Sequence, residues 1–218
     1  MIGFLHTAAS HADTFTRLVR DADAFVPLRH AVHPGLLAAA RQVGADRNGV
    51  RSGVEEALRP LTEAGARVVV CTCSTLGPVA EEARVAGGTI VMRVDRPMAE
   101  RAVALGRRIA VVAALRATVE PTRALLFDAA SRAGRTIEVR DVRCEDAWTH
   151  FERGETKRYL HAIEDAIAEH VGAVDVVVLA QASMAPAAER FTASRVPVLA
   201  SPRLAVEAAL DVYRGRRS

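Results

Sequence analysis

The sequence of 218 residues predicts an α/β fold built from two pseudosymmetric halves, each an open parallel sheet sandwiched by helices. Two observations predict it. Short apolar runs alternate with longer amphipathic stretches, a pattern typical of buried parallel strands joined by helices. A segment of the first half also recurs about 108 residues later, which indicates an internal duplication. The chain is long enough for each half to bury a core.

Eight short apolar runs predict strands, because each is rich in aliphatic residues and bounded by polar ones. They cover residues 2–5, 24–28, 67–71, 89–92, 108–113, 136–142, 174–179 and 196–199. The amphipathic patterns predict helices over residues 12–22, 50–64, 76–86, 97–105, 119–133, 156–171, 185–192 and 203–213. Eight such units could also close into a barrel, so the repeat has to decide between a barrel and two open sheets.

The repeat favours two open sheets. The segment VVVCTCSTLGPVAE at residues 68–81 aligns without a gap with VVVLAQASMAPAAE at residues 176–189. Residues 96–103 also align with residues 203–210 at nearly the same offset. In doubly wound sheets, ligands bind beyond the carboxyl ends of the strands. We therefore expect the site in the cleft between the halves, formed by residues that follow strands.

Composition excludes several classes of protein. Half of the residues are hydrophobic and 25% are charged, which excludes disorder, and 3 cysteines are too few for a disulfide scaffold. The first residues do not resemble a signal peptide, and no apolar run reaches the roughly 18 residues that span a bilayer. We expect a cytoplasmic protein with no membrane partner.

Charge and motifs give no indication of nucleic acid, metal or cofactor. The net charge is only +3, and the one tight basic cluster, Arg214, Arg216 and Arg217, is expected to be a solvated tail. Glycine-rich phosphate loops are absent from the sequence. His30 and His33 form an H-x-x-H on a predicted loop, but no spaced companion ligands accompany them.

Cys73 is the first candidate catalytic residue. It lies where a buried strand gives way to a helix that begins near Leu76. The free N–H groups of a helix N-terminus lower a thiol pKa and can hold a carboxylate, and Ser74 and Thr75 add hydroxyl groups. The alternative is that Cys73 is a small buried strand-end residue. Alternation along the strand predicts that Cys71 is structural.

The repeated loop places Gln181 at the position of Cys73 and Ser183 at the position of Thr75. An amide donates and accepts hydrogen bonds but is not a base, so this half is expected to bind a substrate rather than to deprotonate it. The alternative is that Gln181 caps the helix over residues 185–191.

Three further residues follow predicted strands. A histidine such as His6, next to a thiol, can stabilise the thiolate or transfer a proton itself, although the alternative is an ordinary polar residue. Thr118 is first of all a predicted helix cap, and its hydroxyl could still meet a carboxylate. Whether Cys144 is a second reactive thiol is left open by its position.

The whole chain resembles the aspartate/glutamate racemase superfamily, which includes amino-acid, hydantoin and maleate-acting isomerases and the arylmalonate decarboxylases. The resemblance rests on the duplicated halves, on the strand followed by Cys73, Ser74 and Thr75, and on VDRPM at residues 94–98. It implies a homo-oligomer that needs no cofactor and acts on a small carboxylate.

The same resemblance implies the domain boundaries. The first lobe would comprise residues 1–95 completed by residues 196–218, and it would carry Cys73. The second lobe would comprise residues 96–195 and carry the loop from Gln181 to Ser183.

In such racemases, two thiols on opposite faces of the substrate remove and return the α-proton. By the resemblance, Cys73 is the first thiol, and His6 takes the place of an aspartate that assists it. The positions that hold substrate carboxylates are occupied by Ser74, Thr75, Thr118 and Ser183. The second thiol corresponds to Gln181, so a symmetrical two-thiol racemisation is not expected. Arylmalonate decarboxylases also keep one catalytic cysteine, but in the other half.

Removing a proton next to a carboxylate produces an enediolate, which needs a base and several hydrogen-bond donors. One-sided proton transfer, nucleophilic attack by Cys73, and decarboxylation followed by protonation all stay open. The leading expectation is a racemase-like or isomerase-like enzyme that acts on a small acid, amino acid or hydantoin with a single cysteine. The alternatives are a catalytically degenerate carboxylate-binding protein and a single-cysteine decarboxylase or hydrolase of the same superfamily.

Overall fold

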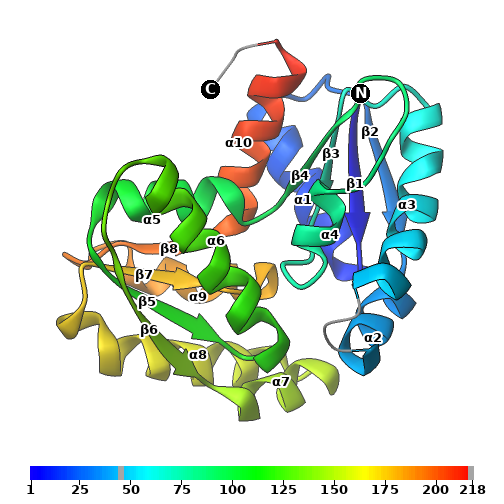
Figure 1. Ribbon diagram of the computed structural model, residues 1–218. Coiled ribbons are helices and arrows are strands. Elements are labelled where there is room, and N and C mark those ends of the chain that lie inside the picture. Colours follow the sequence, from blue (N-terminus) through cyan, green and yellow to red (C-terminus); the bar gives the residue numbers. More distant parts are fainter. Residues whose placement is uncertain (44–46, 216–218) are drawn as a thin grey trace. The chain divides into compact units, whose positions relative to one another are not determined.

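The computed structural model describes residues 1–43 and 47–215, which form two compact units (Figure 1). Unit 1 comprises Met1–Val94 and the C-terminal segment from Pro202, and unit 2 comprises Asp95–Ser201. Each unit contains one four-stranded, all-parallel sheet, with the orders β2-β1-β3-β4 and β6-β5-β7-β8. The two orders are equivalent, so the predicted α/β fold with duplicated halves is confirmed.

The sheet of unit 1 is centred on two buried strands. Its strands are β1 (Ile2–His6), β2 (Leu28–Val32), β3 (Val68–Cys71) and β4 (Ile90–Arg93). Its helices are α1 (Ser10–Ala22), α2 (Pro34–Val43), α3 (Arg47–Glu63), α4 (Gly77–Glu81) and α10 (Ser201–Tyr213). All residues of β1 and β3 are buried, and their register places Leu5 opposite Cys71.

The sheet of unit 2 repeats this arrangement. Its strands are β5 (Arg108–Ala113), β6 (Glu138–Arg143), β7 (Val176–Leu179) and β8 (Val198–Ala200). Its helices are α5 (Arg96–Leu105), α6 (Val119–Arg132), α7 (Glu145–Glu152), α8 (Thr156–His170) and α9 (Ala185–Ala188). Short 3₁₀ turns at residues 116–118 and 182–184 follow β5 and β7, at the carboxyl edge of the sheet.

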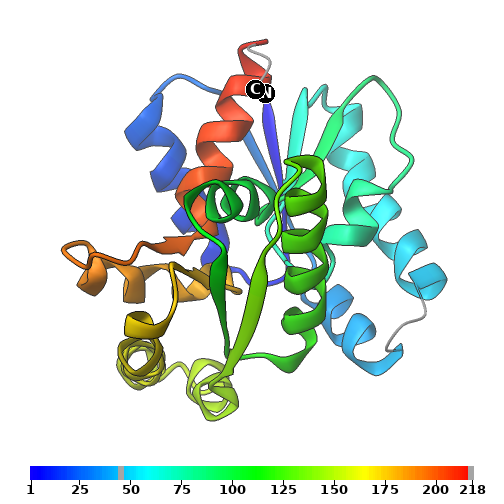
Figure 2. The same cartoon turned by 60° about the vertical axis from the view of Figure 1, so that its left-hand side comes forward.

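Apolar side chains cover both faces of the unit 1 sheet, as expected for central parallel strands. On one face, Leu5 and Cys71 pack in a cluster with residues of α3 and α4. On the other face, Phe4 packs in a cluster with Phe15 of α1 and Val206 of α10. Figure 2 shows α10, in red, beside the blue strands of this sheet. The histidines and the thiol loop described below continue from these buried strands.

The C-terminal strand β8 lies in unit 2, whereas the sequence predicted it in the first lobe. Residues 196–218 were predicted to complete the first lobe, but β8 pairs with β7, with Leu179 opposite Ala200. The repeat explains the difference, because β4 and β8 are the equivalent fourth strands and the chain leaves each half only after them. The helix after each fourth strand belongs to the other unit. Helix α5 follows β4 and packs on α6 in unit 2, whereas α10 follows β8 and packs in unit 1.

Strand β2 and three helices differ from the sequence expectation. β2 begins at Leu28, where pairing with β1 starts, and Phe25 is 94% exposed. The pattern missed this strand because Arg29 and His30 interrupt its apolar run. His30 therefore lies in β2 and not on a loop, and His33 follows the strand. The short helices α2 and α7 were not predicted, and α4 is shorter than the pattern indicated.

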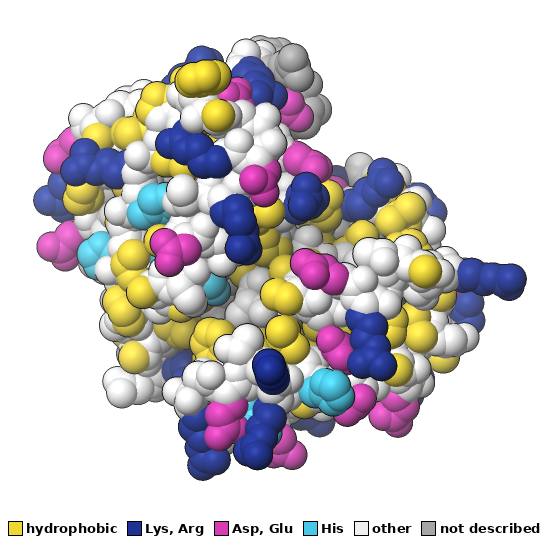
Figure 3. All heavy atoms as spheres, turned by 180° about the vertical axis from the view of Figure 1, so that it is seen from behind, with side chains coloured by type: hydrophobic (Ala, Val, Ile, Leu, Met, Phe, Trp, Pro, Cys, Tyr) yellow, Lys and Arg dark blue, Asp and Glu magenta, His cyan; other side chains and the backbone are white. Residues whose placement is uncertain are grey.

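Charged side chains of both signs are interspersed over the face shown in Figure 3, in keeping with the small net charge. In the predicted basic tail, Arg214 pairs with Asp23 at 2.6 Å, while Arg216 and Arg217 lie outside the described residues. None of the helices in the described part of the chain combines the length and the hydropathy needed to cross a bilayer.

Gly106 provides a test of the packing at the end of α5. A Cβ atom there would lie 2.4 Å from Cβ of Asp175, whose carboxylate accepts hydrogen bonds from the N–H groups of Arg107 and Arg108. We expect Gly106→Ala to lower the free energy of unfolding by about 1–3 kcal/mol, because Asp175 cannot move without losing these bonds. Urea unfolding measures the change.

The matched control is Gly35→Ala in α2, where an added Cβ meets nothing within 4 Å. This substitution should be neutral or slightly stabilising, because alanine favours a helix more than glycine does. Equal unfolding midpoints for the two variants would contradict the close approach at Gly106.

Candidate active site

The carboxyl edge of the unit 1 sheet brings two loop starts together. Because β1 and β3 are parallel neighbours in register, Thr7 and Cys73 follow strands that end side by side. Cys73 is 8% exposed, and the Thr7 hydroxyl and the backbone N–H groups of Thr75 and Leu76 lie near its sulfur, where they favour the thiolate. The Leu76 N–H donates to the carbonyl oxygen of Cys73 at 3.1 Å. Three donor groups therefore lie close to one buried sulfur.

Burial raises the pKa of Cys73 above its ordinary value, although the surrounding hydrogen bonds lower it. The backbone N–H groups of Thr75 and Leu76 lower this thiol pKa as expected, but burial outweighs them. The physical reason is that α4 has only 5 residues and contributes a small dipole, whereas removal of the thiolate from water is costly. The resting thiol is protonated at neutral pH.

Two buried polar groups at this edge have no hydrogen-bond partner in the described part of the chain. The Thr75 hydroxyl lies near the Cys73 sulfur and is the weakest of the groups that lower its pKa, but it makes no hydrogen bond of ordinary geometry. Both ring nitrogens of His11, in the first turn of α1, are also buried without a partner. Such orphaned groups are rare in proteins and commonly meet a ligand or water.

Ser74 is 5% exposed and lies between Cys73 and Thr75. The structure thus keeps the whole predicted loop of unit 1 at one buried strand end, and the role of Ser74 and Thr75 toward a carboxylate stays a prediction.

His6 is fully buried, and both of its ring nitrogens are engaged. Its Nδ1 lies 2.8 Å from Oγ1 of Thr72, and its Nε2 lies 2.8 Å from Nδ1 of His30. On the far side, Nε2 of His30 lies 2.9 Å from Oγ1 of Thr16 in α1. We call these four hydrogen-bonded side chains, Thr72, His6, His30 and Thr16, the histidine network.

The hydrogen bond that Thr72 makes to the backbone fixes the directions of the others in the histidine network. Thr72 Oγ1 donates to the carbonyl oxygen of Leu5, so it accepts from Nδ1–H of His6. Nε2 of His6 then accepts from Nδ1–H of His30, and Nε2 of His30 accepts from the Thr16 hydroxyl. This assignment leaves both imidazoles neutral.

Burial, together with the neighbouring His30 and His11, lowers the pKa of His6 to about 3. Burial likewise lowers the pKa of His30, which Asp13 partly offsets. Neither ring nitrogen of His6 is available to the Cys73 sulfur, and the residue after it, Thr7, is the one whose side chain lowers the Cys73 pKa. Thr7 was identifiable from sequence only as the residue that follows a strand.

In unit 2, the amide of Gln181 connects three backbone segments. Its Oε1 accepts from the N–H of Ala114 at 2.9 Å, and its Nε2 donates to the hydroxyl of Thr118. That hydroxyl donates in turn to the carbonyl of Leu115 at 2.6 Å. Thr118 is the N-cap residue of α6 as predicted, but its side chain makes no capping hydrogen bond, and neither does the side chain of Gln181. Both polar groups are used internally.

Ser183 faces a residue that sequence reasoning missed. Its Oγ lies 2.7 Å from the hydroxyl of Tyr159, a core residue of α8 that is 1% exposed. Burial raises the pKa of Tyr159. In sequence, Tyr159 only continues the apolar pattern of its helix.

Cys144 precedes α7 and donates to the carbonyl of Ala113. Burial raises its pKa to about 11.

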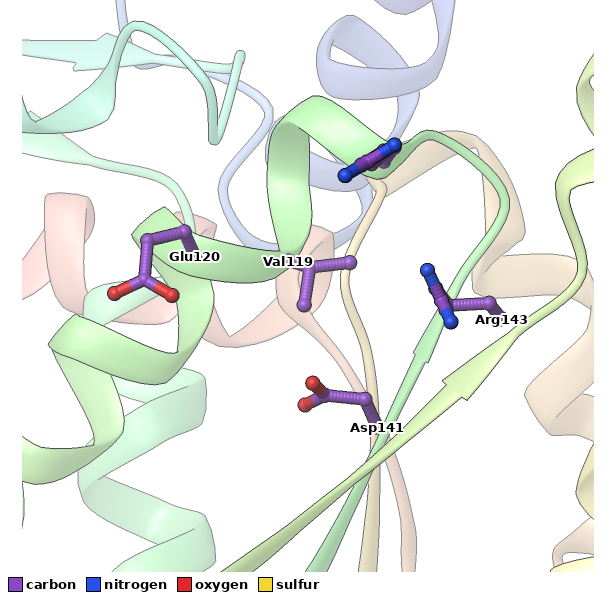
Figure 4. A pocket seen from close by; sticks show the side chains of 5 residues that line it. Val119, Glu120, Asp141 and Arg143 are labelled. Carbon is purple, nitrogen blue, oxygen red and sulfur yellow. The ribbon is translucent and has the colours of Figure 1, made fainter. Parts of the chain in front are cut away.

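Unit 2 also contains a pocket of about 290 Å³ at the carboxyl ends of β5 and β6. It is lined by Arg116, Val119, Glu120, Asp141 and Arg143. Figure 4 shows the carboxylate of Asp141 and the guanidinium of Arg143, both on β6, beside Val119. Asp141 also pairs with Arg123 at 2.9 Å. The lining carries charges of both signs, so it does not select an anion.

No group of three or more side chains in the described residues is arranged to hold a metal ion. His30 uses both ring nitrogens in the histidine network, which leaves it no lone pair for a ligand bond.

The chain belongs to the Asp/Glu/hydantoin racemase family, whose model matches residues 2–209. No curated protein matches it in sequence.

Solved structures support the family fold. An aspartate racemase from Picrophilus torridus has a TM-score of 0.75 at 16% identity, with 99% of this chain and 94% of that chain covered. A glutamate racemase from Francisella tularensis, solved with D-glutamate, has a TM-score of 0.72 at 14% identity, covering 100% and 82%. A mutant of arylmalonate decarboxylase in a sulfate-associated form has a TM-score of 0.60 at 20% identity, covering 100% and 94%.

The neutral state of His6 predicts a pH-dependent stability. Its folded pKa lies below the ordinary value of 6.5, so between pH 6.5 and about 3 the unfolded chain binds the proton that the folded chain excludes. Stability is therefore present above pH 6.5 and falls as the pH falls, by up to roughly 1.4 kcal/mol per pH unit for one such group. Urea unfolding between pH 6.5 and 5 measures the slope, which His6→Gln should flatten.

The internal role of Gln181 predicts a loss of stability in Gln181→Glu. The carboxylate keeps the acceptor for Ala114 N–H but cannot donate to Thr118, whose hydroxyl hydrogen is already given to Leu115. We expect a decrease of about 1–3 kcal/mol in the free energy of unfolding at pH 7. The control Gln42→Glu, exposed on α2, should stay within about 0.5 kcal/mol of the parent. Equal stability of the two variants would refute the internal role.

Proposed function

We propose that this chain is a cofactor-independent enzyme that transfers a proton at the carbon next to a carboxylate of a small acid, amino acid or hydantoin. The observation that carries the proposal is the buried Cys73 sulfur, with the Thr7 hydroxyl and two backbone N–H groups near it. Family membership supports a racemase-like or isomerase-like reaction. We also propose that the enzyme works as a homo-oligomer in the cytoplasm.

The unpartnered groups near this sulfur supply what the substrate needs. A carboxylate requires donors, and the resulting enediolate requires more of them as charge moves onto its oxygens. The Thr75 hydroxyl and the His11 ring are buried and have no protein partner in the described residues. We assign them, with Ser74, to the substrate carboxylate.

Cys73 acts as acid or base according to its protonation state. Since burial raises its pKa, the thiol holds a proton at rest, and its thiolate is a stronger base than an ordinary one. A racemase-like reaction begins with the minor thiolate, which removes the α-proton. Inversion then requires that water protonates the opposite face of the planar enediolate, while the Cys73 thiol gives its proton to the hydroxide that is left. The rate should accordingly rise with pH through the neutral range.

A single-cysteine decarboxylase is a second candidate, favoured by the same raised pKa. Loss of CO₂ from a malonate leaves an enediolate, and the thiol S–H then protonates its carbon. The thiolate recovers its proton from water, so the atoms balance without another reactant. A carboxylate-binding protein is a third candidate, favoured by Gln181, whose amide is used within unit 2 and adds no second acid or base.

The test follows deuterium in D₂O with a panel of amino acids, hydantoins and malonates. A racemase exchanges the α-hydrogen and conserves the substrate, whereas a decarboxylase releases CO₂ and leaves one deuterium in the product. We expect Cys73→Ala to reduce incorporation at least about 100-fold, and Cys144→Ser to leave it unchanged.

If a carboxylate raises the melting temperature of the protein, but no compound of the panel exchanges hydrogen or loses CO₂, the chain is a carboxylate-binding protein. If Cys73→Ala exchanges as fast as the parent, the assignment of the thiol is wrong.

A further inference from the structure

The histidine network joins four elements of unit 1 at the thiol edge. Thr72 follows β3, His6 ends β1, His30 lies in β2 and Thr16 lies in α1. Its inner members Thr72 and His6 are 2% and 0% exposed, whereas His30 and Thr16 are half-buried. The network therefore runs from the buried strand ends toward solvent.

Ring packing holds the two imidazoles in place. The rings of His6 and His30 are stacked, with centroids 5.1 Å apart and 17° between their planes. Phe4 stacks on both, at 5.9 Å from His6 and 5.2 Å from His30. An all-aromatic stack would fill this space without polar atoms. The three hydrogen bonds of the histidine network therefore add a fixed orientation that packing alone does not give.

The network is directly connected to both residues that meet at the sulfur. His6 immediately precedes Thr7, and Thr72 immediately precedes Cys73. Thr72 is fixed further because both its N–H and its hydroxyl donate to the carbonyl of Leu5, at 2.9 and 3.2 Å. The position of the Thr7 hydroxyl relative to the sulfur thus depends on His6 and Thr72.

We propose that His30 is a positioning residue for the thiol site, which acts by fixing the tautomer and the ring orientation of His6. With Nδ1–H of His30 directed at Nε2 of His6, the only N–H of His6 points to Thr72. By fixing His6 and Thr72, which precede Thr7 and Cys73, this arrangement keeps the Thr7 hydroxyl near the sulfur and the sulfur buried. The consequence for catalysis rests on the proposed function, but the effect on the thiol does not.

The titratable groups that face the two rings lie on α1. The ring of His11 packs edge-on against His6 at 6.2 Å, and Asp13 interacts electrostatically with His30. Both residues are left unchanged in the variants below, so a shift in the pH profile of Cys73 reports on the network.

The experiment measures iodoacetamide alkylation of Cys73 from pH 6 to 10, by mass spectrometry of the tryptic peptide of residues 68–84. Fragment ions separate Cys73 from Cys71, and Cys144 in the same sample is the internal reference. His30→Phe keeps an aromatic ring but removes both hydrogen bonds. His30→Asn keeps a donor at the place of Nδ1 and loses the ring. His33→Phe, at an exposed residue after the strand, is the matched control.

We expect His30→Phe to loosen the thiol site, so that alkylation of Cys73 at pH 7 rises about tenfold and its profile moves about one unit toward lower pH. His30→Asn should restore the parent profile to within about threefold, and His33→Phe should leave it unchanged. The Cys144 reference should not respond. An unchanged Cys73 profile in His30→Phe would overturn the proposal, and so would equal profiles in His30→Phe and His30→Asn, since the donor would then be irrelevant.

If His30→Phe does not fold, Thr16→Val tests the same network from its outer end, with Thr16→Ser as the conservative variant. Thr16→Val should raise alkylation of Cys73 in the same direction and Thr16→Ser should not, and equal rates would overturn the proposal. This readout needs no substrate. Failure of the proposed function would appear as unchanged deuterium exchange in Cys73→Ala, whatever the alkylation profiles show.

Discussion

The parallel register of β1 and β3 is the constraint on which the candidate site depends. Leu5 lies opposite Cys71, so the chain leaves the two strands at the same level and in the same direction. That register makes the carbonyl of Leu5 the common acceptor of the Thr72 N–H and hydroxyl. A shift of one residue would reverse the faces of every side chain in a buried strand, so the core itself fixes the register.

The two units use the same loop in different ways. After β3, the loop surrounds a sulfur with donors and leaves the Thr75 hydroxyl without a partner. After β7, the equivalent loop carries Gln181, whose amide joins Ala114 to Thr118 and leaves the loop internally satisfied. A satisfied loop is stable without a ligand, whereas an unsatisfied one gains from binding. Both halves therefore have the same fold, but only unit 1 has a loop with unsatisfied polar groups.

Particular residues show what could be predicted from sequence. The central strands were predictable because they are apolar on both faces, and the positions of Cys73 and Gln181 followed from the repeat. Strand β2 was not predictable, because its inward-facing His30 is polar and finds its partners only in the tertiary structure. The direction of the Cys73 pKa shift could not be predicted either, because it depends on how completely neighbouring elements exclude water. The partners of His6 and Tyr159 come from other elements, and nothing in the local pattern indicates them.

The exchange of α5 and α10 between the units also orders the events of biosynthesis. Unit 2 is one continuous stretch, Asp95–Ser201, so all its parts are present once that stretch has been made. Unit 1 starts earlier but needs α10, whose Val206 and Leu210 belong to its core. Until those residues emerge from the ribosome, α1 covers one face of the first sheet only in part, and the half that is translated first is completed last.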